Sequence, residues 1–152
     1  MTRFDLDISY AQLCVFDANL DHPYNDWTPA HVQQGFAWRP GSVSFALPDA
    51  NAAQVTIRTA ESPVSPGADA KRAVVVPILK QNADLIVGSI MGGEHQLALP
   101  AGRYSLMFEV TDDAPPGVTL TFYPSTEDEF AVLLVGKDMN RDATIVREAE
   151  PA

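Results

Sequence analysis

Short segments that alternate apolar and polar residues recur along the whole chain, and they constrain its fold more than any other feature. In "FDLDISY", residues 4–10, the side chains of Phe4, Leu6, Ile8 and Tyr10 alternate with polar ones. A period of two is that of a β-strand, whose successive side chains point to opposite faces. The pattern predicts a half-buried strand with Tyr10 on the apolar face. We expect "LCVF" to continue this strand through a bulge.

Eight further segments have the same character, and turn signals rich in Gly, Pro, Asn and Asp separate them. They are residues 42–47, 54–60, 72–79, 84–90, 95–100, 103–111, 118–123 and 130–136. About eight to nine short strands at such spacing are typical of an antiparallel β-sandwich. We therefore predict an all-β fold, with residues 1–152 forming a single β-sandwich domain. Pro77 inside "VVVPIL" indicates an edge position or a bulge, because proline cannot donate a backbone hydrogen bond.

One short helix is predicted near residues 29–34. Thr28 is a residue type that caps helix starts, and Pro29 suits the first helical position. Gly35 can adopt the left-handed conformation that ends a helix.

The chain is acidic, and this limits its partners. Its 152 residues include 10 Lys+Arg and 20 Asp+Glu, a formal net charge of −10. Residues 1–76 carry 8 acidic and 5 basic residues, whereas residues 77–152 carry 12 and 5. Such a balance argues against direct binding of nucleic acid or of an anionic membrane, because too few cations face too many carboxylates. It is compatible with a basic protein partner, and equally with plain solubility.

The compartment is predicted from two simpler features. Cys14 is the only cysteine, so no internal disulfide forms, and its apolar neighbours indicate a buried thiol. No apolar stretch has the length of a signal peptide's core or of a membrane span. We expect a cytoplasmic protein that does not insert into membranes.

The crowded stretch "HPYNDWTPAHVQQGF" contains possible metal ligands or catalytic groups in His22, Asp26 and His31. Their spacing matches no familiar site, since no two of them stand four residues apart on one helix. Cys14 is expected on a buried strand, and no serine lies in a G-x-S-x-G turn. We therefore expect no catalytic residue, no metal and no cofactor.

Two acidic groups and one tryptophan are the candidates for binding a partner. The groups are Asp112 with Asp113, and Glu127, Asp128 and Glu129 in "STEDEF". Either is a solvated acidic loop or a negative patch that meets a positive one on another protein. Trp27 either anchors the core or is exposed as a binding hot spot, and the sequence leaves both positions open.

The chain resembles the competence protein J family over about 100 residues. "ISYAQLCVFD" followed by "DWTPAHVQQGFAWRPGSVSFAL" carries the resemblance, and "LALPAGRYSL", residues 97–106, is similar to a later hairpin of that family. The matching positions are Ile8, Ser9, Tyr10, Gln12, Val15, Phe16, Asp26, Trp27, Thr28, Gly35, Phe36, Gly41, Val43, Ser44 and Phe45. The last third matches only loosely. The resemblance implies an immunity-type inhibitor of a DNA-degrading nuclease; it supplies no inhibitory residues.

Three hypotheses follow for the function. The first is a non-catalytic inhibitor that binds a basic nuclease through acidic residues. The second is a Ca²⁺-binding or small-ligand-binding β-sandwich module that uses Asp112, Asp113 and residues 127–129. The third is an enzyme that uses His22, Asp26 and His31. The first is favoured, while the oligomeric state is not readable from the sequence.

Overall fold

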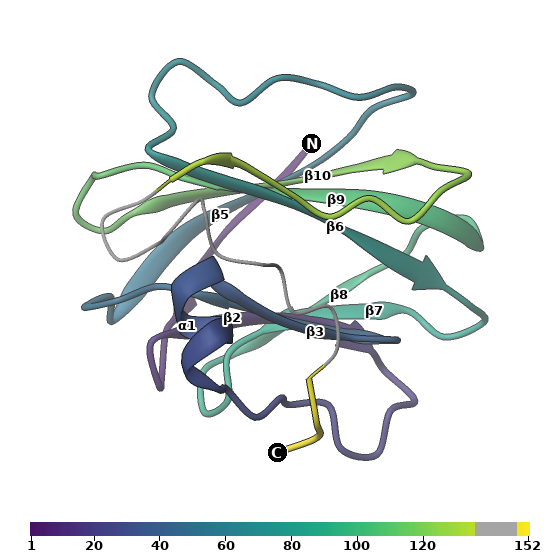
Figure 1. Ribbon diagram of the computed structural model, residues 1–152, viewed down its shortest axis with the longest axis horizontal. Coiled ribbons are helices and arrows are strands. Elements are labelled where there is room, and N and C mark those ends of the chain that lie inside the picture. Colours follow the sequence, from purple (N-terminus) through teal and green to yellow (C-terminus); the bar gives the residue numbers. More distant parts are fainter. Residues whose placement is uncertain (136–148) are drawn as a thin grey trace.

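Two β-sheets pack face to face in the computed structural model, which describes residues 1–135 and 149–152 (Figure 1). The first sheet has the strand order β1-β5-β10-β9-β6-β11. Its strands are β1 (Thr2–Asp7), β5 (Ala52–Thr59), β10 (Gly117–Pro124), β9 (Gly102–Val110), β6 (Arg72–Lys80) and β11 (Ala131–Leu134). Neighbouring strands are antiparallel except β5 and β10, which are parallel.

The second sheet has the order β3-β4-β2-β7-β8 and is antiparallel throughout. Its strands are β3 (Phe36–Arg39), β4 (Ser42–Ala46), β2 (Gln12–Asp17), β7 (Leu85–Gly88) and β8 (Glu94–Leu97). The helix α1 (Pro29–Gln34) leads into the edge strand β3 (Figure 1).

The core lies between the sheets and is built from the apolar side of each alternating strand. Leu106 and Phe108 of β9 face Val43 and Phe45 of β4, and all four are almost fully buried. The rings of Phe45 and Phe108 stack with centroids 4.3 Å apart. Burial of apolar area at about 25 cal/mol per Å² is the main stabilising contribution in such a core. The sequence prediction of an all-β sandwich is confirmed.

The predicted helix is also confirmed, together with both of its ends. The side chain of Thr28 accepts a hydrogen bond from the backbone of His31, and Nδ1 of His31 accepts one from the backbone of Thr28. This reciprocal pair is a capping box, in which a histidine takes the place of the usual glutamate. Gly35 has φ 86°, and its N–H donates to the carbonyl of His31.

The structure has eleven strands within the described residues, whereas the sequence predicted about eight to nine. One of the additional strands is β3, four residues long, which the sequence analysis did not identify. The other arises because the first predicted strand is two strands in different sheets. Gly136, the last residue of the predicted strand 130–136, lies outside the described residues.

The expectation of one strand over residues 4–10 that continues through a bulge is wrong. β1 ends at Asp7, and the chain turns at Tyr10 and Ala11, whose φ angles are 53° and 54°. Two consecutive left-handed residues between Ser9 and Gln12 reverse the chain and carry it from the first sheet to the second. Tyr10 is consequently 69% exposed, although the alternation placed it with the core residues Leu6 and Ile8.

Pro77 has an edge position even though β6 lies inside its sheet. β9 pairs with β6 along its whole length, but β11 pairs only with Ala73–Val75. Within the described residues no strand lies beside Pro77 on the β11 side, so the missing N–H leaves no gap in the ladder.

Candidate protein-binding surface

The two predicted acidic groups lie at opposite ends of the sandwich. Asp112 and Asp113 belong to the loop that precedes β10, whereas Glu127, Asp128 and Glu129 follow its last residue. A strand rises about 3.3 Å per residue, so the eight residues of β10 separate the groups by roughly 25 Å. One metal ion cannot be bound by both groups across that distance. The second functional hypothesis, in which Asp112, Asp113 and residues 127–129 together bind Ca²⁺, is therefore contradicted.

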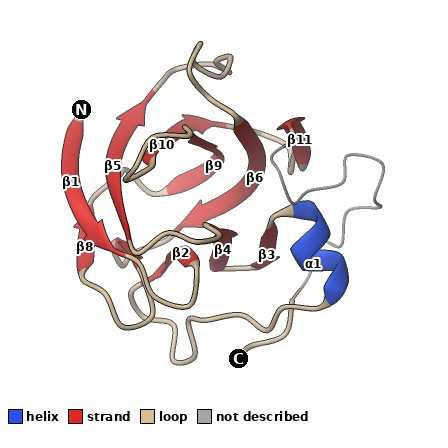
Figure 2. Cartoon of the chain, turned by 90° about the vertical axis from the view of Figure 1, so that its left-hand side faces the viewer, coloured by secondary structure: helices blue, strands red, loops and turns tan. Residues whose placement is uncertain are grey.

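The end that carries Asp112 and Asp113 is here called the cleft end. Four loops meet there: residues 8–11, 47–51, 89–93 and 111–116 (Figure 2). Backbone hydrogen bonds join neighbouring loops, from Ile8 N to Asn51 O at 2.9 Å and from Leu47 N to Ala11 O at 2.7 Å. The opposite end, with residues 125–130, is called the far end and lies on the right of Figure 1.

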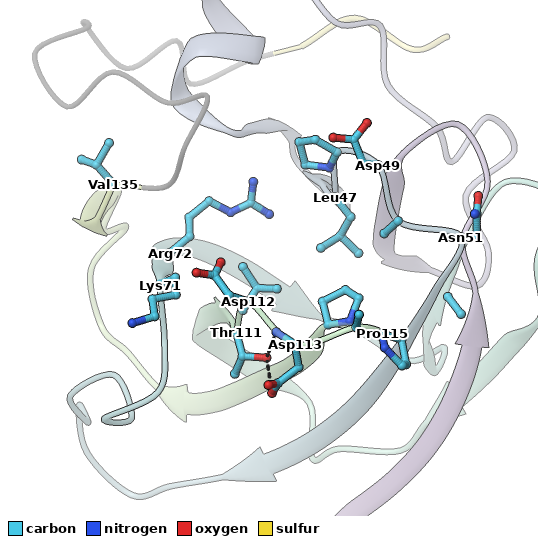
Figure 3. Close-up of a pocket in the computed structure, with 16 residues that line it drawn as sticks. Leu47, Asp49, Asn51, Lys71, Arg72, Thr111, Asp112, Asp113, Pro115 and Val135 are labelled. Carbon is cyan, nitrogen blue, oxygen red and sulfur yellow. Dashed lines mark hydrogen bonds between the residues drawn. The ribbon is translucent and has the colours of Figure 1, made fainter.

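A cleft of about 760 Å³ opens at the cleft end between the loops 47–51 and 111–116 (Figure 3). Leu47, Val110 and Pro115 form apolar parts of its wall. Arg72 reaches into it from the start of β6, and Asp49 and Asp112 stand at its rim (Figure 3). Asp113 accepts a hydrogen bond from the hydroxyl of Thr111 at 2.9 Å, which fixes the direction of its carboxylate.

The charge of this end is unbalanced toward carboxylates. Six acidic residues are exposed around it: Asp7, Asp49, Asp69, Glu94, Asp112 and Asp113. Among the described residues the bases there are Lys71, which is exposed, and Arg72, which is buried. The guanidinium of Arg72 donates to the carbonyl of Ala46 and lies 5.3 Å from the ring centre of Phe108. Arg72 therefore serves the packing of the cleft floor and presents little positive charge to solvent.

The far end mixes its charges more evenly. Asp128 forms an ion pair with Arg103 at 2.7 Å, and both side chains are more than half exposed. Glu127 and Asp128 line a second cleft of about 610 Å³ beside Trp38 and Tyr104. Glu129 lies near the hydroxyl of Tyr123, which donates to it at 3.5 Å. The pKa of Tyr123 is raised, chiefly by burial and also by the negative charge of Glu129.

Trp27 is half-buried beside the start of β2, toward the cleft end. Its indole N–H donates to Oε1 of Gln12 at 3.4 Å, and Nε2 of Gln12 donates to the carbonyl of Tyr10 at 3.5 Å. The segment before it runs along the outer face of the second sheet. There Nδ2 of Asn25 donates to Ala37 O, Ser42 Oγ and Ser44 Oγ. Trp27 thus has one side against the protein and one side in solvent, so neither of the two predicted positions describes it fully.

The groups considered for chemistry have structural roles or are exposed. His31 is buried and Nδ1 belongs to the helix cap, while His22 and Asp26 are exposed. Within the described residues no three His, Cys, Asp or Glu side chains gather in a way that could hold a metal ion. Burial raises the pKa of the Cys14 thiol to about 11, and a hydrogen bond with Ser44 opposes this effect. A thiol with such a pKa is a poor nucleophile at neutral pH.

Three exposed residues of the cleft end were missed from the sequence: Tyr10, Asp49 and Met91. Asp49 has φ 63°, and "PDAN" was noticed only as a turn. Met91 is 77% exposed in the loop between β7 and β8. Tyr10 was assigned to the core because "SYAQ" contains no glycine or asparagine to mark the turn. No helix in the described part of the chain is long and apolar enough to cross a membrane.

Comparison with known proteins identifies the family. The profile of competence protein J (ComJ) matches residues 5–134. The DNA-entry nuclease inhibitor of Bacillus subtilis (strain 168) is 30% identical over 102 residues, which are 67% of this chain and 76% of that protein. The crystal structure of ComJ from Bacillus subtilis, described as an inhibitor of the DNA degrading activity of NucA, superposes with a TM-score of 0.72 at 24% identity. It covers 82% of this chain and 96% of that chain, so the fold is shared. Since the family profile extends over most of the sequence, this chain belongs to the competence protein J family.

Proposed function

We propose that this chain inhibits a DNA-degrading nuclease by binding to it, without catalysis of its own. The observation that carries the proposal is the relative of 30% identity that is named a DNA-entry nuclease inhibitor. Membership of the family supports the class of activity, which is nuclease inhibition. It does not identify the nuclease, which an experiment has to find.

The charge of the chain supports this mode of action. A nuclease that binds DNA presents cations to the phosphates, because neutralising phosphates provides most of its affinity. A protein of net charge −10 is attracted to such a surface, and electrostatic steering accelerates the encounter. The proposed partner is therefore a nuclease whose contact surface is basic.

The cleft end is the surface that we assign to this contact. Asp112, Asp113 and Trp27 lie there, and Asp49 adds a further carboxylate at the rim of the cleft. Hydrogen-bonded loops hold the carboxylates in place, which lowers the entropic cost of binding. Glu127, Asp128 and Glu129 contribute through the long-range field, because they lie at the far end.

The proposed location is the cytoplasm. A buried thiol at Cys14 with no second cysteine is compatible with a reducing compartment. Cell fractionation with an antibody against the chain tests this point, and recovery from the medium or the membrane fraction would contradict it.

The decisive test is inhibition of purified nucleases. The panel consists of NucA and the DNA-degrading nucleases encoded in the same genome as this chain. We expect stoichiometric loss of DNA cleavage by at least one of them, with a complex that survives gel filtration. If the inhibitor binds tightly, the rate of DNA cleavage should not recover in proportion to the concentration of DNA that is added. No complex and full cleavage at micromolar inhibitor with every nuclease would refute the proposal.

A further inference from the structure

The turn at Tyr10 and Ala11 has a backbone that its residues do not favour. Both residues lie in the left-handed region, with φ angles of 53° and 54°. This conformation brings Cβ close to the following carbonyl oxygen, so turns of this kind normally use Gly, Asn or Asp. The fold needs a reversal here, but it does not need a tyrosine to make one.

Neighbouring loops hold this turn in place. The Ser89 hydroxyl lies 2.8 Å from the carbonyl oxygen of Gln12 and 3.1 Å from that of Ser9, so its one hydrogen can be donated to either, and it accepts from the N–H of Ser9. The N–H of Met91 donates to the Ser9 hydroxyl at 2.8 Å. Strain of this kind persists only where the surroundings over-determine the conformation. Here the loop between β7 and β8 does so, together with the backbone hydrogen bond from Leu47 N to Ala11 O.

The held turn presents two large apolar side chains to solvent. Tyr10 is 69% exposed and Met91 is 77% exposed, and the Tyr10 hydroxyl lies 3.9 Å from the Met91 sulfur. We call this pair the Tyr10–Met91 knob. Tyrosine and methionine are both enriched at protein interfaces. Tyrosine in addition buries a large area at a low cost in conformational entropy.

Carboxylates surround the knob at the cleft end. Asp7 ends the strand before the turn, Glu94 begins the strand after the Met91 loop, and Asp49 lies in the loop whose Leu47 binds Ala11. All three are exposed. An apolar centre with an acidic border is complementary to a basic protein surface that contains an apolar pocket.

We propose that the Tyr10–Met91 knob is the anchor by which this chain binds its nuclease, with the acidic border steering the approach. This inference rests on the proposed function and names the residues that would carry it. Tyr10 enters an apolar recess beside the basic groups of the nuclease, and Met91 packs along the same recess.

The first experiment separates binding from folding with Tyr10→Asn. Asparagine tolerates the left-handed conformation, so the melting temperature should stay the same or rise. The dissociation constant for the inhibited nuclease should rise by about thirty-fold or more, as for removal of a hot-spot side chain. The matched control is Leu79→Asn, which removes a 43% exposed apolar side chain that lines the far-end cleft and should leave binding unchanged.

The second experiment uses the unmodified chain, so that folding of a variant does not enter. Peroxide oxidation of methionines is followed by mass spectrometry with and without the inhibited nuclease. Met91 should oxidise at least about tenfold more slowly in the complex, because burial in an interface removes peroxide access. Met1 is 83% exposed and precedes the first residue of β1, away from the cleft end, so its oxidation should not change.

The outcomes distinguish this inference from the proposed function. Full inhibition by Tyr10→Asn, or unchanged oxidation of Met91 in the complex, would overturn the anchor while leaving nuclease inhibition standing. Failure of the unmodified chain to inhibit any nuclease of the panel would overturn both.

Discussion

The indole N–H of Trp38 donates a hydrogen bond to the carbonyl oxygen of Pro77, 2.7 Å away, and thereby joins the two sheets of the sandwich. Trp38 lies on β3 and Pro77 on β6, at the position that β11 does not reach. The ring of Trp38 also packs edge-on against Phe130, with centroids 5.0 Å apart. Because no strand of the described residues pairs with Pro77 on the β11 side, its carbonyl is left as an acceptor, and the tryptophan of the other sheet uses it.

Replacement of Trp38 by phenylalanine should lower the free energy of unfolding by about 1–2 kcal/mol, because a buried carbonyl loses its donor while an aromatic ring remains. Urea denaturation followed by circular dichroism measures the change. Trp27→Phe is the control, since its indole donates over 3.4 Å at a half-exposed site and its removal should cost less. If the two variants lost the same free energy of unfolding, the hydrogen bond between Trp38 and Pro77 would contribute no more to stability than the bond of Trp27.

The helix cap makes a second prediction about stability. Thr28→Ala removes the side chain that accepts from the His31 backbone and should cost about 1 kcal/mol. Thr28→Ser keeps the hydroxyl and should recover most of the loss. Thermal melts of the three proteins provide the comparison. If serine were as destabilising as alanine, the contribution of residue 28 would lie in its methyl group instead of its hydrogen bond.

Local chemistry in the sequence was sufficient to predict the sandwich and the helix. Thr28, Pro29 and Gly35 each act at the helix ends through their own backbone preferences, so a single sequence reveals them. The alternation of Leu120 and Phe122 with Thr119 and Thr121 likewise follows from the period of a strand.

The structural features that the sequence did not predict depend on contacts between residues far apart in the chain. Tyr10 makes a turn because Ser89 and Met91, in the loop between β7 and β8, bind Ser9, and no local pattern at residues 9–12 shows this. The parallel pairing of β5 with β10 joins segments about sixty residues apart, as Val55 opposite Val118 illustrates. Asp112 and Asp128 are far apart because the strand β10 lies between them. The hypothesis that joined them in one Ca²⁺ or small-ligand site assumed a spatial arrangement that periodicity cannot give.

A third prediction concerns pH and the buried thiol. Burial holds the pKa of Cys14 at about 11 in the folded protein, against an ordinary value of 9.0. Above pH 9 the unfolded chain releases this proton while the folded chain keeps it, so the unfolded state is favoured as pH rises toward 11. Stability should therefore be unaffected by Cys14 below about pH 9 and should fall above it, at most by about 1.4 kcal/mol per pH unit.

Cys14→Ala is the variant that isolates this effect. The half-buried phenol of Tyr24 has a pKa raised chiefly by burial and also by the negative charges of Cys14 and Glu94, and it acts in the same direction at still higher pH. The variant removes the contribution of Cys14 to that pKa as well as the thiol itself. Urea melts at several values between pH 7 and pH 10.5 should show a shallower alkaline decline for Cys14→Ala. A thiol reagent at pH 8 should react with the native protein only as fast as it unfolds. Rapid labelling of the native thiol would show that Cys14 is accessible and would remove the basis of the prediction.

The last prediction compares the two ends of the sandwich by their effect on association with the inhibited nuclease. One variant combines Asp49→Asn, Asp112→Asn and Asp113→Asn at the cleft end. The other combines Glu127→Gln, Asp128→Asn and Glu129→Gln at the far end. Both remove three charges, so the net charge changes from −10 to −7 in each and any difference between them reflects position alone.

In stopped-flow experiments at low ionic strength, the association rate constant of the cleft-end variant should be roughly tenfold lower than that of the unmodified chain. The decrease for the far-end variant should be several-fold smaller, because steering depends on charges near the contact. Dissociation rates should change little in either, since rim charges act mainly before docking. Asparagine suits the left-handed backbone of residue 49, so the cleft-end variant should keep its stability. At high salt the two variants should converge on the unmodified chain. A slower association for the far-end variant would place the nuclease at residues 125–130, with Trp38 and Arg103 as the neighbouring contacts, and would exclude the Tyr10–Met91 knob from the interface.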